Sequence, residues 1–119
     1  MSFQAYTTAA ARSEAPRDTE FRLFAQVTRA LVEASTTDQS DFKTRIEALD
    51  WNRRVWTTMA NDCASEGKAM PPQLRAGIIS LSMFVARYSS QVMSSAMPVD
   101  PLVEINRMIM QGLATRAAA

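Results

Sequence analysis

Residues 71–98 read PPQLRAGIISLSMFVARYSSQVMSSAMP, and large apolar side chains recur through them every three or four positions. This spacing places the side chains along one side of an α-helix. The series is uninterrupted and comprises Leu74, Ile78, Leu81, Val85, Tyr88 and Val92. Two prolines open the stretch, as the first turn of a helix allows, and Met97-Pro98 closes it. The stretch therefore predicts a long helix that packs lengthwise against its neighbours.

Three further stretches show the same helical period. The first opens near Pro16, and its buried side is predicted to comprise Phe24, Val27, Leu31 and Ala34. The second is capped by Ser40 or Asp38 and runs to about Ala64, with a main stripe of Phe42, Ile46, Leu49, Trp56, Ala60 and Cys63. The third starts at Asp100-Pro101, and its stripe is Leu102, Ile105, Ile109 and Leu113, widened by Met108.

The glycine and proline content of the whole chain favours helices over strands. It contains three glycines and five prolines, and no stretch alternates apolar and polar residues as a half-buried strand does. The prediction is an all-α, single-domain bundle of four main helices over residues 15–113. Residues 1–14 are expected to form a short helix or an arm, and residues 114–119 a frayed tail.

Composition narrows the function. The chain has 119 residues, 47% of them apolar, which suits one domain with one core. Its 13 basic and 12 acidic residues nearly cancel, which argues against direct nucleic-acid binding. No stretch has the length of a membrane span, no signal peptide is evident, and the single Cys63 fits a reducing compartment, so we expect a cytoplasmic protein.

The chain contains no histidine. Histidine is the usual general base near neutral pH, the partner of nucleophilic serine or cysteine, and a frequent metal ligand. No glycine-rich phosphate loop is present, and no spacing singles out a pair of carboxylates. We therefore expect no catalytic residues, no metal and no cofactor, and a protein that works by binding other proteins.

Two helices carry apolar residues on a second side. Ile79 and Met83 lie roughly opposite Leu81, and Trp51 and Val55 lie away from Leu49. One interpretation is that both helices are central and buried on several sides. The other is a groove for an apolar partner segment, since exposed apolar patches in soluble proteins commonly mark interfaces. Sequence alone leaves both open.

The arginines permit two roles as well. Asp50 and Arg54 are four residues apart and are expected to pair on a helix surface. Arg53 falls on the side of Leu49 and Trp56, where it would either lie over the tryptophan or pair with a buried acid. Arg54 is also a candidate for a partner contact.

Several strings together resemble the bacterial flagellar protein FlaF family. They are ALDWNRRVW at 48–56, MPPQLRA at 70–76 leading into IISL at 78–81, and INRMIMQGL at 105–113. The opening is similar too, in AY at 5–6, EAPR at 14–17 and TRAL at 28–31. The similarity covers roughly residues 3–113, with the strings in the family's order.

This resemblance implies a flagellum assembly factor that binds flagellin, as a flagellin-specific secretion chaperone for type III export and a positive regulator of flagellin synthesis. Family members act alongside FlbT, which restrains flagellin translation. The family supplies no catalytic residues. The matched polar residues could bind a partner or fix helix ends and helix contacts; they are Asn52, Arg53, Arg75, Asn106 and Arg107.

Three alternatives remain open at this point. The chain could regulate flagellin translation through FlbT or flagellin mRNA without chaperoning export. The spare apolar faces could instead form a homodimer, or both could be ordinary core in a bundle without a groove.

Overall fold

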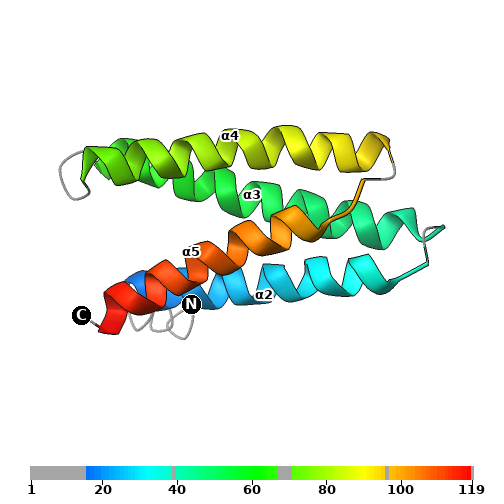
Figure 1. The fold of residues 1–119 in the computed structure, drawn as a ribbon, viewed down its shortest axis with the longest axis horizontal. Helices are drawn as coiled ribbons and strands as arrows, with labels where there is room; N and C mark the ends of the chain where they lie inside the picture. The colour runs from blue at the N-terminus through cyan, green and yellow to red at the C-terminus, as the bar shows by residue number, and fades with distance from the viewer. Residues whose placement is uncertain (1–15, 39, 67–70, 96, 119) are drawn as a thin grey trace, which may run out of the picture.

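The fold is that of a computed structural model, which describes residues 16–38, 40–66, 71–95 and 97–118. These residues form four helices, α2 (Pro16–Thr36), α3 (Phe42–Glu66), α4 (Pro72–Ser94) and α5 (Asp100–Ala118), and no strand. Successive helices run in opposite directions (Figure 1). The all-α bundle predicted from sequence is confirmed. The expectation for residues 1–14 lies outside the described residues, and fraying of residues 114–119 stays a prediction.

The four helices do not pack equally on one another. Extensive contacts join α2 to α5, α3 to α4 and α2 to α3, whereas α4 and α5 contact each other only sparsely within the described residues. Figure 1 shows α3 with α4 above and α2 with α5 below, with α5 leaving α4 at their connection and descending onto α2. Thus α2 and α3 each pack closely on two neighbours, and α4 and α5 on one each.

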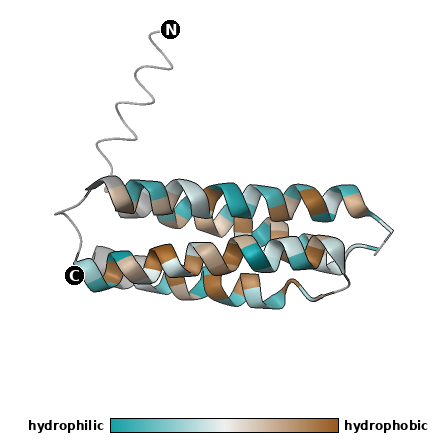
Figure 2. Cartoon of the chain, turned by 90° about the horizontal axis from the view of Figure 1, so that it is seen from above, coloured by the Kyte–Doolittle hydropathy of each residue, from teal (hydrophilic) through white to brown (hydrophobic). Residues whose placement is uncertain are grey.

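The core is built from one side of each helix. Its largest fully buried apolar side chains are Trp56, Phe24, Leu31, Leu49, Leu102, Val27 and Val85. Phe24 meets Trp56 edge-to-face, with ring centroids 5.4 Å apart, a favourable geometry for aromatic pairs. Hydrophobic and hydrophilic residues are interspersed along every helix (Figure 2), as expected when only one side of each is buried.

The predicted buried side of α2 is confirmed, because Phe24, Val27, Leu31 and Ala34 are all buried. The stripe predicted for α3 is wrong in its first two turns. Phe42 is 68% exposed and Ile46 47% exposed. These turns lie at an end of the bundle where α4 has already given way to an extended residue, Ser95, and therefore have little to pack against.

The buried side of α5 is rotated relative to the prediction. Val103, which is not part of the predicted stripe, is 7% exposed, whereas Met108 from the predicted stripe is 65% exposed. Met110, also outside the predicted stripe, accepts a hydrogen bond at its sulfur from the Thr28 hydroxyl at 3.9 Å. The reason is that α5 packs on α2 and not on α4, which turns this side inward. On α4, Leu81 is half-buried and Leu74 is 37% exposed.

The residues that begin the helices agree in part with the prediction. Asp41, and not the predicted Ser40 or Asp38, caps α3, because its Oδ1 accepts the backbone N–H of Thr44 at 3.2 Å. The Asp38 carboxylate accepts the N–H of Ser40 at 3.0 Å, which lowers the pKa of Asp38. Pro71 and Pro72 open α4 as predicted. The N–H of Leu102 bonds the Val99 carbonyl at 2.9 Å, so α5 is entered from Val99.

Polar side chains cross the centre of the bundle. The Trp56 indole donates to Oδ1 of Asn106 at 2.9 Å, and Nδ2 of Asn106 donates to Oδ1 of Asn52 at 2.8 Å. Both asparagines are fully buried. Asn52 and Asn106 thus make contacts between helices, one of the two roles that their sequence positions allowed. Cys63, the single cysteine of the chain, also lies on α3 and is buried.

Candidate functional site

A cleft lies between α2 and α3 and contains three of the residues expected from sequence to bind a partner, Trp51, Arg54 and Val55. Its volume is about 410 Å³, and its lining comprises Glu20, Leu23, Phe24, Trp51, Arg54, Val55, Thr58, Met59 and Asp62. Val55 is buried, Trp51 is half-buried and Leu23 is 38% exposed. We call this site the α2–α3 cleft. Its apolar centre and charged border suit an apolar segment that carries polar groups on its other side.

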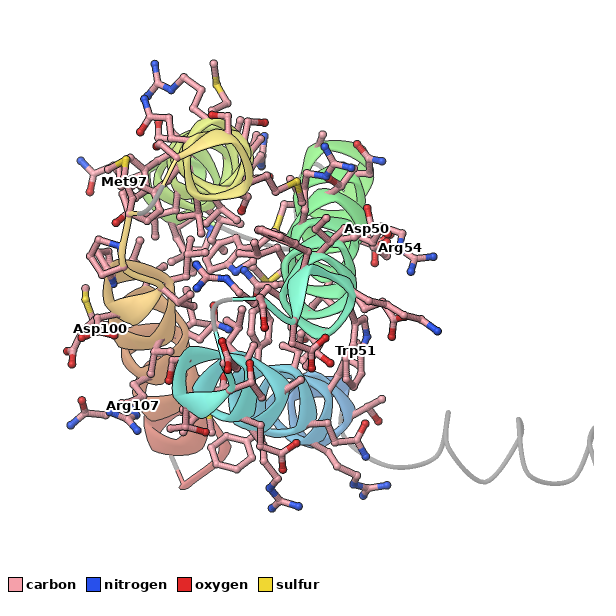
Figure 3. The ribbon with its side chains drawn as sticks, turned by 90° about the vertical axis from the view of Figure 1, so that its right-hand side faces the viewer. Asp50, Trp51, Arg54, Met97, Asp100 and Arg107 are labelled. Atoms are coloured by element: carbon pink, nitrogen blue, oxygen red, sulfur yellow. The ribbon has the colours of Figure 1, made fainter. Side chains whose placement is uncertain are left out.

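Arg54 lines the α2–α3 cleft and pairs with Asp50 on the same helix. Its guanidinium lies 3.1 Å from the Asp50 carboxylate, and that of Arg53 lies 2.9 Å from the same group. The predicted Asp50–Arg54 pair is therefore present, and Arg53 pairs with an acid that is partly exposed and not buried. Exposed pairs of this kind contribute little to stability. Figure 3 shows Asp50 and Arg54 on the outer side of α3, with Trp51 on the side toward α2.

Ile79 and Met83 lie apart from the α2–α3 cleft. Met83 is 61% exposed and Ile79 is half-buried, and neither residue lines it. The Ser82 hydroxyl approaches the Trp56 carbonyl at 3.4 Å, so that side of α4 lies against α3. The two predicted apolar surfaces are therefore separate. Arg75 on α4 is half-buried, and Arg107 is exposed on the side of the bundle away from Trp51 (Figure 3).

A second cleft, which the sequence did not predict, lies at the end of the bundle where α2 gives way to α3. Its volume is about 550 Å³, and its lining is Ser35, Phe42, Arg45, Ile46, Leu49, Val92, Met93, Ser94, Ser95, Met97, Pro98, Val99 and Asp100. We call it the end cleft. The exposed Phe42 and Ile46 line it, and both had been assigned to the core. The available signal was Phe42's place directly after the polar linker, in the first turn of α3.

Among the described residues, no group of three or more cysteine, aspartate, glutamate or histidine side chains could hold a metal ion. Within the same residues, no helix combines the length and the hydropathy needed to cross a membrane. Both clefts instead combine apolar side chains with a few charged ones, an arrangement suited to holding part of another protein.

Comparison with known proteins gives one match. The model of a protein family described as flagellar protein FlaF matches residues 2–113. No curated protein matches the chain, and no solved structure does. The family match includes α2, α3 and α4 in full and α5 as far as residue 113.

Proposed function

Because the chain belongs to the FlaF family of flagellar proteins, we propose that it is a cytoplasmic flagellum assembly factor that binds flagellin. In this role it is a flagellin-specific secretion chaperone for type III export and a positive regulator of flagellin synthesis. The proposal assigns it no catalytic step, cofactor or metal. FlbT is the second partner that the proposal includes.

The observation that carries flagellin binding is the apolar surface left in the α2–α3 cleft. The client segment in this proposal is an amphipathic terminal helix of flagellin. Leu23 and Trp51 present apolar surface to solvent above the buried Val55. An apolar helix side placed there would lose contact with water, which is the main favourable term in helix-in-groove binding.

The border of the cleft supports an amphipathic client in particular. Glu20 and Asp62 supply negative charge, and Arg54 supplies positive charge. A helix whose apolar side faces Trp51 directs its polar sides toward these groups. Because Arg54 and Asp62 are exposed, their charges contribute to orientation and association rate more than to affinity.

A matched pair of substitutions on α2 tests the proposal. Leu23 and Val32 are 38% and 36% exposed, but only Leu23 lines the α2–α3 cleft. Leu23→Glu should weaken flagellin binding by about tenfold or more, since it places a charge where apolar surface is buried. Val32→Glu should leave the affinity unchanged. Calorimetric titration of each full-length variant with monomeric flagellin gives the comparison, and equal affinities would exclude this cleft.

Trp51 and Met83 allow the two predicted surfaces to be separated. Trp51→Glu should reduce the affinity for flagellin, whereas Met83→Glu tests whether the outer side of α4 contributes independently. Circular dichroism must first show that each variant remains folded. Unchanged affinity in both variants would mean that neither surface holds flagellin.

The alternative, translational regulation through FlbT or flagellin mRNA without chaperoning, is distinguished by pull-down. A chaperone should retain flagellin at about one to one in moderate salt. Direct RNA binding should weaken steeply as salt rises, because phosphate contacts release counterions, and the net charge of +1 gives it little support. Retention of FlbT but not flagellin would favour the alternative.

A further inference from the structure

The α2–α3 cleft begins beside the first turns of α2. The two helices run in opposite directions (Figure 1), and Phe24 of α2 meets Trp56 of α3. Eight residues further along each helix, Pro16 therefore lies near the level of Ala64. Trp51, at the other end of the cleft, is thirteen residues from Ala64, or about 20 Å along α3. The cleft thus extends away from the point at which the chain enters α2.

Part of the apolar lining of this cleft stays open to solvent. Leu23 is 38% exposed and Trp51 is half-buried, whereas Val55 and Met59, which also line the cleft, are buried. Apolar surface that remains exposed in a cleft is favoured as a place where another segment packs. The bundle therefore holds two apolar side chains ready for such a segment.

The sequence that directly precedes α2 has a composition that suits this surface. Residues 1–11 read MSFQAYTTAAA and contain no charged side chain. Phe3, Tyr6 and Ala10 recur at intervals of three and four, which would place them on one side of a helix. The FlaF family model matches the chain from residue 2 onward. The family unit therefore includes this apolar segment together with the bundle.

The segment is long enough to reach the far end of the cleft. As a helix, residues 3–10 would span about 10 Å, and the six residues that follow, up to Pro16, would span up to about 20 Å when extended. Together these lengths exceed the axial distance of about 20 Å from Pro16 to Trp51. Ala15 precedes a proline, which disfavours the helical conformation at Ala15 and allows the chain to change direction there. The segment can therefore fold back along α2.

The order of charges along the segment agrees with this direction. A segment that folds back from Pro16 places Arg12 at the near end of the cleft, where Glu20 and Asp62 supply negative charge. The same direction places the aromatic Phe3 at the far end, beside Trp51. Charges of opposite sign at the border of such a contact set its orientation more than its strength.

We infer that residues 3–10 of the chain pack as a short helix in the α2–α3 cleft when no client is bound, with Phe3 against Trp51 and Tyr6 against Leu23. A client that enters the cleft then has to displace this segment, which makes the segment an intramolecular competitor. Such competition weakens the apparent affinity by the fraction of chains in which the cleft is open. The competition with flagellin rests on the proposed function, whereas the contact between the segment and the cleft does not.

The two tryptophans of the full-length chain allow the contact to be tested by NMR without any client. Trp51 lines the cleft, whereas Trp56 is fully buried and bonds Asn106, so its indole resonance reports on the core. Phe3→Ser should shift the indole resonance of Trp51 and leave that of Trp56 in place. Thr8→Ser is the matched control, because Thr8 would lie on the opposite side of the helix from Phe3. An unchanged Trp51 resonance in Phe3→Ser would overturn the inference.

Photocrosslinking shows whether the contact is made within one chain. The probe is p-benzoylphenylalanine, introduced singly at Phe3 and, as the control, at Thr8. The expected result is an intramolecular crosslink from Phe3 to the peptide of α3 that contains Trp51, and no such crosslink from Thr8. A crosslink from Phe3 that joins two chains would identify a second copy as the partner of the segment and overturn the inference.

Titration with monomeric flagellin tests the competition. The full-length double variant Phe3→Ser, Tyr6→Ser should bind flagellin about three- to tenfold more tightly than the unaltered chain, because the cleft no longer has to be cleared. Repeating Leu23→Glu and Val32→Glu in this variant measures the contribution of the cleft itself without the competing segment.

The outcomes separate this inference from the proposed function. A shifted Trp51 resonance with unchanged flagellin affinity would overturn the competition and leave only the contact within the chain. Weaker flagellin binding by the double variant would mean that the segment holds the client, which also overturns the competition. An unchanged Trp51 resonance, with flagellin binding still weakened by Leu23→Glu, would overturn the inference while the proposed function stands.

Discussion

Asn106 of α5 accepts the indole N–H of Trp56 of α3 across the centre of the bundle, at 2.9 Å. The same asparagine donates to Asn52 at 2.8 Å, so one buried amide serves two groups on the opposite helix. Buried polar groups that lose their partners cost much more than the bond itself contributes. The relationship between Asn106 and Trp56 is therefore a sensitive point of the fold.

Asn106→Ala should lower the free energy of unfolding by about 2–4 kcal/mol, because it leaves the Trp56 donor and the Asn52 acceptor unpaired and opens a cavity. Asn61→Ala, at an exposed position of α3, is the control and should change stability by less than about 0.5 kcal/mol. Urea unfolding followed by circular dichroism measures both. Equal midpoints would contradict the central role of Asn106.

Ile46 and Leu49 are both apolar residues of α3 that were predicted to be core, but only Leu49 is buried, at 1% exposed. Leu49→Ala should therefore cost about 2–5 kcal/mol. Ile46→Ala should cost less than about 1 kcal/mol, since little surface is removed from a packed environment. A comparable loss in the two variants would show that the end cleft is closed in solution.

The start of α3 depends on the Asp41 carboxylate, which accepts the Thr44 N–H and also the Thr44 hydroxyl at 2.7 Å. Asp41→Ala should lower stability by about 1 kcal/mol, the usual effect of losing a capping side chain. Asp38→Ala should have a smaller effect, because Asp38 bonds Ser40 before the helix begins. Thermal unfolding of the two variants decides between these positions.

The Asp38 carboxyl should titrate below its ordinary range, since the backbone N–H and then the side chain of Ser40 lower its pKa. A lowered folded-state pKa means that the contribution is present above the unfolded value and is lost as the pH falls through the folded one. Ser40→Ala should raise the pKa partly back toward the ordinary value. NMR titration of the carboxyl carbon checks this, and an unchanged pKa in Ser40→Ala would assign the shift to the backbone alone.

Gly77→Ala should raise the free energy of unfolding by up to about 1 kcal/mol, because alanine has the higher helix propensity and its Cβ meets no other atom. Denaturant unfolding of the isolated protein measures the change. A loss of stability would mean that Gly77 has a structural role inside the bundle.

The fold was predictable where a helix is covered along its whole length. Val27 and Leu31 of α2 repeat on one side, and both are fully buried. The sequence did not predict the buried side of a helix where that side depends on which helices are neighbours. Val103 and Met108 of α5 are both apolar, so their periodicity cannot say which of them faces α2.

The candidate site was likewise predicted only in part from the sequence. Trp51 and Val55 stood out as apolar residues on a second side of α3, and the structure places them together in the α2–α3 cleft. Phe42 and Ile46 fit the main stripe equally well, and their exposure follows from the end of α4, which lies elsewhere in the sequence. Local spacing detects an apolar side but not the helix that covers it.

Alkylation of the buried Cys63 thiol can report how the chain binds a client protein. This buried sulfur reacts with iodoacetamide only during transient openings of α3, so its alkylation half-life measures how often such openings occur. A client that settles on the outside should lengthen that half-life. A client that separates the helices should shorten the half-life. A time course of Cys63 alkylation, followed by mass spectrometry, distinguishes the two cases.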